Sequence, residues 1–376
     1  MHLKIGVIGN LANVGYNITT YLSDIGIDAK LILHPHEILK WKQLNPNINY
    51  NSINTLEIIP KTVLDNKFTR RISEILFLNR YDVIISVAIG GIWSLPFIRK
   101  PVVCYATGSD LRELAAGIGY KGLQVFLAKR AFKQAKLVFY SPDLGHIEMI
   151  DKLHLKHVIP WKQFVNTDFW KLDLQIQKRS SVGLKIFHPT ALTWIPKFPG
   201  QSLKCNNLLF EGFRLFLDRG GIGTLHYLKR GQNISETEAL IDKLDLKQFC
   251  FAVGENLNMK QLKSKMLNAD VIVDQFHPGG GFGLITLEAM ALGKPVIVGL
   301  TDDMMKLAYP PPSESPPIIQ AFSKDEIANQ LLSLQDVIIL KEKGTSSRNW
   351  ILNNHEPVKL AHWYMREIKK VLDKIS

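Results

Sequence analysis

The sequence has few cysteines and no motif typical of a zinc site. Cys104, Cys205 and Cys250 are the three cysteines of the 376-residue chain, and no two of them form a CxxC pair. This pattern excludes a disulfide framework and is typical of a reducing compartment. An HExxH motif and any tight cluster of histidine, cysteine and aspartate are also missing, so we expect no metal site.

Long apolar runs are missing as well. No stretch approaches the roughly 18 consecutive apolar residues that a membrane-spanning helix needs. The N-terminus is polar again at Asn10 and Asn13, which is too early for a signal peptide. Hydrophobic residues make up 46% of the chain, and no Pro-, Gly- or Ser-rich tract is long enough to predict disorder. We therefore expect a soluble, cytoplasmic protein with a folded core.

Acidic residues are scarce relative to basic ones. The chain has 46 Lys and Arg against 34 Asp and Glu, which gives a net charge of +12. This surplus favours a polyanionic partner, whether nucleic acid, an anionic membrane surface or a phosphorylated substrate. Because the sequence contains no recognisable nucleic-acid-binding module, nucleic acid is the least favoured of the three.

Short apolar runs alternate with segments of helical period in both halves of the chain. The runs are apolar on both faces, which is typical of parallel sheets covered by helices on each side. Ten such candidate strands begin at Lys4, Ala29, Asp82, Pro101, Lys136, Leu184, Gly223, Phe249, Asp270 and Pro295. The alternation predicts an α/β protein with two doubly wound, Rossmann-like domains.

The chain is long enough for two domains. The polar, basic stretch 175–183 is the best candidate for a linker, so we expect an N-terminal domain over 1–176 and a C-terminal domain over 177–355. A final helix over 356–376 is a candidate to return to the N-terminal domain. Because open parallel sheets bind ligands at the carboxyl ends of their strands, two facing sheets would form a ligand cleft between the domains.

A glycine-rich loop between a strand and a helix is the most informative segment, 277–298 (HPGGGFGLITLEAMALGKPVIV). We expect the strand to end at Phe276 and the helix to begin near Leu284. Glycines let the backbone approach a ligand closely, and the first helical turn offers free N–H groups to a phosphate. Glu288, about one turn into the helix, is suited to bind a ribose diol; a tight turn with an exposed Glu288 is the alternative.

The stretch GFGLITLEAMALGKPVI resembles the signature of retaining GT-B glycosyltransferases of family 4. Weaker similarities occur in the family's order: GNLANVGYN near the N-terminus, TGSDLRE from Thr107, SPDL from Ser141, VNTDFW from Val165 and KCNNLLFEGFRLFL from Lys204. The resemblance implies two Rossmann-like domains that face a central cleft. It also implies transfer of a sugar from a nucleoside-diphosphate sugar to a hydroxyl acceptor (a glycan, a lipid-linked sugar or a small molecule), with retention and without a required metal or other cofactor.

By this resemblance, the donor-binding residues gather in the C-terminal domain. Glu288 is the second glutamate of the family's E-x7-E motif, which binds the donor ribose. Lys204 is the lysine that neutralises the donor diphosphate as the glycosidic bond breaks, and it counts as catalytic. The glycine loop and its flanks supply further expected donor contacts, which are Gln275, His277, Gly281, Phe282, Gly283 and Leu284. A purely structural loop histidine is the alternative for His277, and a surface charge is the alternative for Lys204.

Two positions depart from the family pattern. Gly280 stands where the first glutamate of the motif is expected, and Ala191 stands where an arginine against the diphosphate is expected. The polar side chains just upstream of the glycine loop are candidates to replace the glutamate. Lys229 and Arg230 are candidates to replace the arginine, with a solvated loop charge as the alternative.

The loop TGSDLRE is expected to face the cleft from the N-terminal domain. Asp110 is suited to orient an acceptor hydroxyl, and Ser109 and Arg112 are expected on the acceptor side. Asp110 is equally well suited to act as the N-cap of a helix that begins at Leu111.

The first strand-to-helix loop contains Asn10, Asn13 and Gly15. We expect Asn13 and Gly15 to approach the donor diphosphate from the N-terminal domain. Because Asn and Gly tolerate left-handed backbone conformations, a role confined to the turn is the alternative.

The segment 121–136 is predicted to form an amphipathic helix with Lys129, Arg130, Lys133 and Lys136 near its polar side. A solvated basic face is the default interpretation. Many members of the resembling family glycosylate lipid-linked acceptors, so the resemblance favours peripheral contact with an anionic membrane at its inner face.

Two other functions stay open at this point. A GT-B epimerase or hydrolase would turn over a nucleotide sugar without an acceptor. A non-catalytic GT-B paralogue would act as a binding or scaffold subunit, and the departures at Gly280 and Ala191 favour this possibility.

Overall fold

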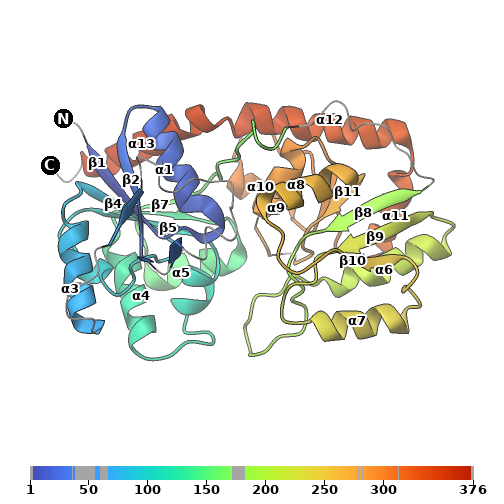
Figure 1. Ribbon diagram of the computed structural model, residues 1–376, viewed down its shortest axis with the longest axis horizontal. Helices are drawn as coiled ribbons and strands as arrows, with labels where there is room; N and C mark the ends of the chain where they lie inside the picture. The colour runs from blue at the N-terminus through green and yellow to red at the C-terminus, as the bar shows by residue number, and fades with distance from the viewer. Residues whose placement is uncertain are drawn as a thin grey trace. The chain divides into compact units, whose positions relative to one another are not determined.

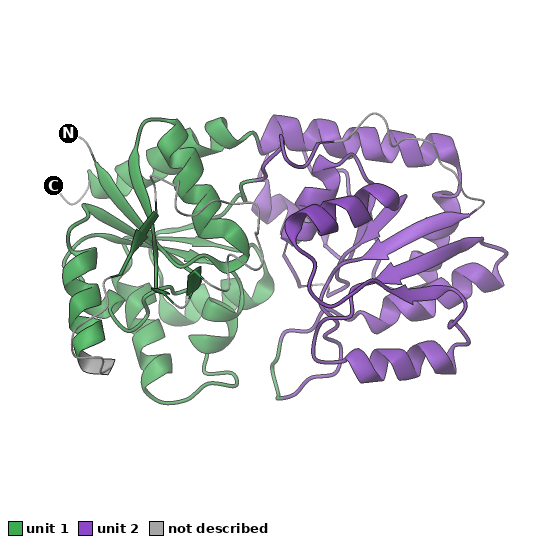
Figure 2. Ribbon diagram, in the orientation of Figure 1, with its two compact units in different colours: residues 1–164, 198–201, 356–376 green, residues 165–197, 202–355 purple. Residues whose placement is uncertain are grey.

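A computed structural model describes residues 3–35, 37–38, 56–59, 67–171, 183–277, 279–281, 283–311 and 313–373 of the chain. The chain divides into two compact units, which Figure 2 shows in different colours. The first comprises residues 1–164, 198–201 and 356–376, and the second comprises 165–197 and 202–355. The chain leaves the first unit at Phe164, before the predicted boundary at residue 176, and most of the predicted linker lies outside the described residues.

The first unit contains a parallel sheet in the order β3-β2-β1-β4-β5-β6-β7. Its strands are β1 (Lys4–Ile8), β2 (Asp28–Leu33), β3 (Leu56–Ile58), β4 (Val83–Val87), β5 (Val102–Ala106), β6 (Leu137–Tyr140) and β7 (Val158–Pro160). Its helices are α1 (Val14–Asp24), α3 (Lys67–Leu78), α4 (Leu123–Gln134), α5 (Leu144–Leu153) and α13 (Pro357–Leu372). Figure 1 shows α1 and α13 on one face of the sheet and α3, α4 and α5 on the other.

The last helix completes the core of the first unit. Leu360, Tyr364 and Ile368 of α13 pack into one buried cluster with side chains of α1 and the sheet. The Tyr364 hydroxyl donates to the carbonyl oxygen of Lys162 at 2.6 Å and lies 3.1 Å from the Tyr105 hydroxyl. A segment that follows residue 164 by more than 190 residues is therefore part of the first hydrophobic core.

The second unit contains a parallel sheet in the order β10-β9-β8-β11-β12-β13. Its strands are β8 (Leu184–His188), β9 (Gly223–Tyr227), β10 (Cys250–Ala252), β11 (Val271–Val273), β12 (Val296–Val298) and β13 (Ile319–Gln320). Its helices are α6 (Asn207–Asp218), α7 (Ile234–Lys243), α8 (Met259–Asn268), α9 (Leu284–Ala291), α10 (Asp302–Ala308), α11 (Lys324–Ser333) and α12 (Val337–Asn354). One buried cluster contains side chains of α6, α7 and α11, and another contains those of α8, α9, α10 and α12. The sheet is therefore covered on both faces.

All ten strands predicted from apolar runs are confirmed. The structure adds β3, β7 and β13, which have only two or three residues each and lie at sheet edges. Short edge strands are half-solvated and offer too few residues for the two-sided apolar pattern; β10, also at an edge, has a longer apolar run in the sequence. The predicted helix start at Leu284 is also confirmed.

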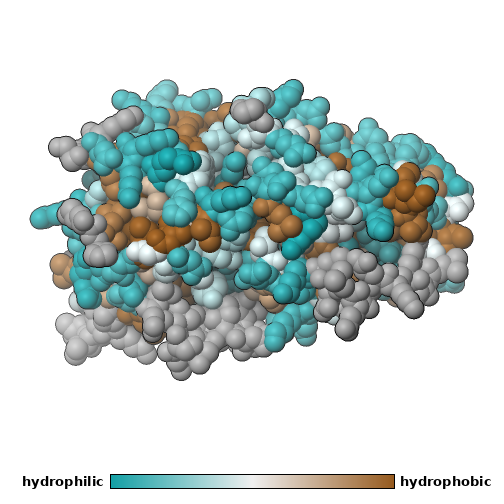
Figure 3. Space-filling model, turned by 90° about the horizontal axis from the view of Figure 1, so that it is seen from above, coloured by the Kyte–Doolittle hydropathy of each residue, from teal (hydrophilic) through white to brown (hydrophobic). Residues whose placement is uncertain are grey.

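Apolar side chains on the face seen in Figure 3 form separate small patches within a mainly hydrophilic surface. Among the described helices, none combines the length and the apolar character needed to cross a bilayer.

Candidate functional site

In the second sheet, β8 and β11 are neighbours, with β9 on the far side of β8 and β12 on the far side of β11. The direction in which the chain adds strands to the sheet therefore reverses between β8 and β11. In open α/β sheets, ligands bind outside the carboxyl ends of the strands at such a switch point. His188 ends β8, and Asp274 follows the last residue of β11. The polar groups that gather beyond these two residues are the candidate site.

Asp274 ties the glycine-loop helix to the sheet. Its buried carboxylate accepts from the Thr190 hydroxyl at 2.6 Å and from the Thr286 hydroxyl, in the first turn of α9, at 2.7 Å. Gly283, the N-cap of α9, lies so close to this carboxylate that a Cβ atom there would collide with Oδ2. The second glycine of the GFG sequence is therefore required by the packing of the helix start against the strand end.

His188 is held as a neutral imidazole. Its Nδ1 lies 2.8 Å from the carbonyl oxygen of Val273, and its Nε2 lies 2.7 Å from the amide nitrogen of Asn206. The amide can only donate, so Nδ1 carries the ring proton and donates to the carbonyl. Burial lowers the pKa of His188 to about 4, and the positive charge of Lys204 acts in the same direction. This ring joins the ends of β8 and β11 and does not serve as an acid at neutral pH.

Lys204 is placed beside the glycine loop by both its backbone and its side chain. Its carbonyl oxygen accepts from the Phe276 N–H at 2.9 Å. Phe276 lies three residues beyond Val273, where β11 ends, so the predicted strand end at Phe276 is wrong. Nζ of Lys204 donates to Oε1 of Gln275 at 2.7 Å, and Nε2 of Gln275 donates to the carbonyl oxygen of Gly281 at 2.9 Å. Three of the predicted donor-binding residues are thus joined in one chain of hydrogen bonds.

Gln275 also lies next to the position of the missing glutamate. A Cβ atom on Gly280 would stand 3.0 Å from Nε2 of Gln275. His277 instead shapes the loop, because its Nδ1 accepts from the Gly279 N–H at 3.1 Å and its carbonyl oxygen accepts from the Gly280 N–H at 2.9 Å. Phe282 lies outside the described residues.

Glu288 is buried in α9, with 6% of its surface exposed. This excludes the alternative of an exposed helix residue. Desolvation raises the pKa of its carboxyl group from 4.5 to about 8. Burying a carboxyl group is costly unless a partner compensates for the lost water, and a strongly perturbed carboxyl group is often part of a functional site.

The two basic residues after β9 differ in their surroundings. Lys229 is half exposed and forms an ion pair with Glu238 of α7 at 2.6 Å. The carbonyl oxygen of Arg230 accepts from the N–H of Leu192, so the backbone of Arg230 lies directly beside Ala191, where the family's arginine is expected. The geometry favours Arg230 over Lys229 as the residue near that position.

In the first unit, the carboxylate of Asp110 is engaged by its own loop. It accepts from the Thr107 N–H at 3.1 Å and from the Gly108 N–H at 2.9 Å. The helical turn runs over Asp110–Leu114 with Ser109 as its N-cap, so the alternative of Asp110 as N-cap of a helix starting at Leu111 is wrong. Asp110 shapes the loop, while the exposed Ser109 remains accessible to solvent.

Arg112 is paired within the first unit. Its Nη1 lies 3.3 Å from Oδ2 of Asp143, the N-cap of α5, and its aliphatic stem packs against Gly145. The fully buried His146 lies between two carbonyl oxygens, with Nδ1 2.9 Å from Ser141 and Nε2 2.8 Å from Gly108. His146 of α5 thus supports the backbone of the TGSDLRE loop.

The first strand-to-helix loop is tightly folded. Gly15 lies so close to the carbonyl oxygen of Gly9 that no other residue fits, and Asn13 has a left-handed backbone with φ 63°. Asn10 accepts from the Tyr16 N–H at 2.7 Å, while its buried Nδ2 has no hydrogen-bond partner among the described residues. The fold of the loop thus explains why Gly15 and Asn13 occupy these positions. The Nδ2 group of Asn10 is a hydrogen-bond donor without a partner among the described residues.

Several residues of the site were not found from the sequence. Thr190, Asp274 and Thr286 form the network at the switch point, and Asp143 and His146 form the support of the first unit's loop. The one available signal was position, because Asp274 directly follows a buried strand. Within the described ranges, no group of three or more His, Cys, Asp or Glu is arranged to hold a metal ion.

Known proteins resemble this chain in structure. No family model and no curated protein sequence matches it. HepE of Anabaena, solved in complex with UDP and glucose, matches with a TM-score of 0.68 at 14% identity, over 98% of this chain and 100% of that one. A glycosyltransferase of Rickettsia africae matches with a TM-score of 0.64 at 14% identity, over 99% of this chain and 98% of its own.

The lipopolysaccharide outer core galactosyltransferase WaaB matches with a TM-score of 0.56 at 14% identity, over the full length of both chains. At this identity, the likeness establishes the fold. Two parallel sheets with helices on both faces, matched along nearly the whole chain by these solved structures, identify the fold as GT-B.

Proposed function

We propose that this protein is a retaining glycosyltransferase that moves a sugar from a nucleoside-diphosphate sugar to a hydroxyl acceptor. The observation that carries the proposal is the group at the switch point of the second sheet, where Lys204, Gln275 and the glycine loop are hydrogen-bonded together. Glu288 adds a buried carboxyl group on α9, the helix that follows the glycine loop. HepE, which has the same fold, was solved with UDP-glucose and with UDP.

The proposed roles follow from the charges of the groups. The first turn of α9 offers backbone N–H groups to the donor diphosphate, and Glu288 accepts hydrogen bonds from the ribose hydroxyls. Lys204 neutralises the negative charge that grows on the leaving diphosphate, where a preorganised cation lowers the barrier. Retention would follow a same-face mechanism, in which the leaving phosphate oxygen takes the proton of the acceptor hydroxyl.

Gln275 and Arg230 are proposed to compensate for the two departures from the family pattern. The amide of Gln275 lies beside the position of the missing glutamate and is already bonded to Lys204. The backbone of Arg230 lies beside Ala191, and its exposed side chain is proposed to supply the guanidinium that is missing there. A non-catalytic paralogue is the alternative that Gly280 and Ala191 favour.

Peripheral contact with an anionic membrane is part of the proposal. The α4 helix exposes 57% of Leu123 and 56% of Phe126, and Arg130 and Lys133 follow at helical spacing on the same side. A helix that presents apolar and basic side chains together suits the interface of an anionic bilayer.

Binding and turnover separate the three functions. Calorimetric titration with UDP and GDP, followed by product analysis with a panel of nucleotide sugars, should detect nucleotide binding and sugar transfer that requires an acceptor. Turnover without an acceptor would indicate an epimerase or hydrolase, and binding without turnover would indicate the non-catalytic paralogue.

Lys204→Ala tests the site itself. We expect a strong loss of kcat/KM, because the charge matters most as the leaving group forms. Lys204→Arg is not expected to restore activity, because the guanidinium fork and the ammonium differ in geometry. The matched control is Lys247→Ala, which removes an exposed lysine paired with Asp242. Equal kinetics in Lys204→Ala and the control would reject the role of Lys204.

A further inference from the structure

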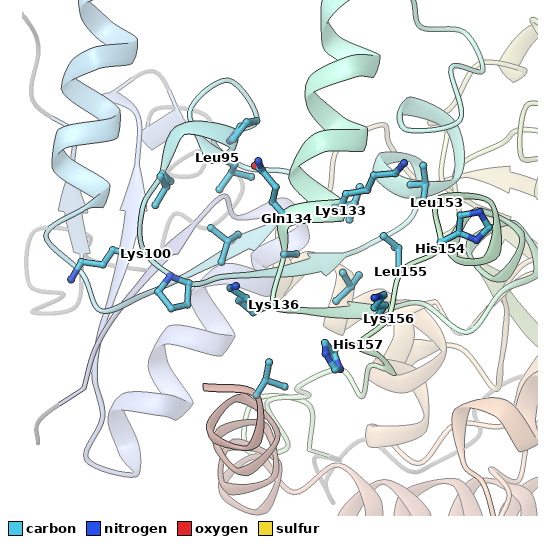
Figure 4. A pocket seen from close by; sticks show the side chains of 18 of the residues that line it. Leu95, Lys100, Lys133, Gln134, Lys136, Leu153, His154, Leu155, Lys156 and His157 are labelled. Carbon is cyan, nitrogen blue, oxygen red and sulfur yellow. The ribbon is translucent and has the colours of Figure 1, made fainter. Parts of the chain in front are cut away.

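The first unit has a pocket of about 950 Å³ at the amino ends of its strands. Its walls come from the segments that lead into β5, β6 and β7, and from Val371 of α13 (Figure 4). The loops of Gly9 and Asp110 lie at the opposite, carboxyl edge of the same sheet. This pocket is therefore separate from the loops that the proposed function uses in this unit.

Positive charge dominates the lining of the pocket. Its five cationic side chains are Arg99, Lys100, Lys133, Lys136 and Lys156, and none of the described residues that line it is Asp or Glu. Lys100 points away from the other labelled side chains in Figure 4 and lies 3.9 Å from Asp82. The side chains of the other four have no partner in the described part of the chain.

Two helices end at the pocket and offset part of this charge. The C-termini of α4 and α5 lead into the loops that carry Lys136 and Lys156. Each helix end contributes roughly half a negative charge, so the four unpaired cations retain a surplus of about three. Cations gathered in a concave site repel one another, and a multivalent anion removes this repulsion.

The chemistry of the walls indicates the kind of anion. Lysines bind phosphate groups as point charges with three donors each, and three of the four unpaired cations are lysines. His154 and His157 add ring nitrogens at the rim, while Leu95, Val138 and Val371 supply an apolar floor. Apolar walls strengthen the field of the charges around them.

We propose that this pocket binds an oligophosphate, a small anion with at least two linked phosphate groups. The phosphates would lie among Lys133, Lys136 and Lys156, and the apolar floor would accept an organic part of the ligand. An oligophosphate headgroup on a lipid would offer the same chemistry as a soluble oligophosphate. The test therefore includes both a soluble probe and vesicles.

Inorganic tripolyphosphate is the probe, titrated calorimetrically into the full chain at low and high salt. We expect one ion bound per chain in this pocket, with an affinity that falls as salt rises. Lys136→Glu combined with Lys156→Glu should weaken this binding at least tenfold. The control, Lys341→Glu combined with Lys343→Glu, makes the same change of net charge on exposed positions of α12 and should stay within twofold of wild type.

Further variants locate the bound ion. Lys204→Ala should keep the tripolyphosphate binding that depends on Lys136 and Lys156, whatever it does to binding at the donor site; loss of all binding in this variant, with the pocket variant unaffected, would overturn the proposal. If the glutamate variant is misfolded by circular dichroism, Lys136→Gln combined with Lys156→Gln should still weaken binding at least threefold. Equal affinity in the pocket and control variants would overturn the proposal.

Vesicles distinguish the sources. Flotation with phosphatidylglycerol vesicles that depends on Lys136 and Lys156, without any tripolyphosphate binding, would overturn the proposal in favour of a flat membrane contact. Tripolyphosphate binding that is lost in the pocket variant, without flotation that depends on Lys136 and Lys156, supports a soluble oligophosphate.

Discussion

Glu288 has a carboxyl group in the interior of the second unit, where burial raises its pKa to about 8. If this group accepts hydrogen bonds from a ribose, Glu288→Gln should weaken UDP binding by about 1.5–3 kcal/mol at pH 8.5, because a charge-assisted bond becomes a neutral one. Calorimetry measures the change, with Glu342→Gln on the exposed side of α12 as the control. UDP affinity equal to that of wild type would remove Glu288 from the donor site.

The same residue makes stability depend on pH. The folded protein keeps a proton on Glu288 up to about pH 8, whereas an unfolded glutamate loses it near 4.5. The stability that this proton contributes is complete below about pH 4.5 and is lost as the pH rises toward 8. Glu288→Gln cannot ionise, so its stability relative to wild type should rise by up to about 1.4 kcal/mol per pH unit between these limits and level off above them.

Urea unfolding at pH 5.5, 7 and 8.5 measures this difference. Glu74, whose pKa is raised to about 7 mainly by burial, affects both proteins equally and cancels in the comparison. Parallel pH profiles for wild type and Glu288→Gln would show that the carboxyl group is not desolvated in solution.

Individual site residues differ in how far the sequence predicts them. Lys204, Gln275 and Gly281 were predicted because they flank a glycine loop with a recognisable pattern, and the structure brings them together. Lys229 looked equally suitable, yet its charge is taken by Glu238, which lies on a different element. Pairing between side chains on different elements has no periodic signal, so the sequence does not predict it.

At the level of elements, a hydroxyl in the first turn of α9 ties this helix to the end of β11. Thr286→Val keeps the shape of the side chain but removes the hydroxyl that donates to Asp274. The buried carboxylate of Asp274 then accepts one hydrogen bond fewer. We expect a loss of about 1–3 kcal/mol in the free energy of unfolding, together with weaker UDP binding. Thr286→Ser keeps the hydroxyl and should recover most of both quantities. Equal behaviour of the two variants would show that the bond contributes nothing.

Vesicle flotation tests whether α4 contacts an anionic membrane. Leu123→Ser combined with Phe126→Ser should reduce recovery with anionic vesicles several-fold, because each exposed apolar side chain adds up to about 1.5–3 kcal/mol when it enters the bilayer interface. Val337→Ser combined with Ile338→Ser makes an equivalent change on α12, at residues that are 57% and 69% exposed. Wild-type binding should weaken as salt rises; equal recovery on neutral and anionic vesicles would leave α4 as an ordinary solvated surface.

Whole-molecule architecture follows closely from the sequence where strands are central and buried. The ten predicted strands needed only an apolar run bounded by turns. Nine of them lie inside a sheet, which fits the parallel arrangement, while β10 is a partly exposed edge strand. The order of the strands and the division of the chain into two units are not predicted by apolar runs, because they depend on packing between segments that are distant in the sequence. The residues 198–201, for example, belong to the first unit, where Phe198 packs against Gly119.

Two matched tyrosines test whether the two units unfold separately. Tyr364 donates from its hydroxyl within the first unit, and the Tyr309 hydroxyl lies 2.6 Å from Nε2 of His355 in the second. Tyr364→Phe and Tyr309→Phe should each cost about 1–2 kcal/mol. Hydrogen exchange should show lost protection in 3–164 for Tyr364→Phe and in 183–355 for Tyr309→Phe. Identical changes across both ranges would show a single cooperative unit.

The position of α13 in the chain has a consequence for synthesis on the ribosome. Residues 165–355 are made after the strands of the first sheet and before the helix that covers one face of it. At roughly 5–20 residues per second, translation of this stretch takes about 10–40 s. During that time, Tyr105 and Phe139 lack the cover that Tyr364 of α13 gives them in the folded protein, so this face of the first sheet stays incomplete for a defined interval.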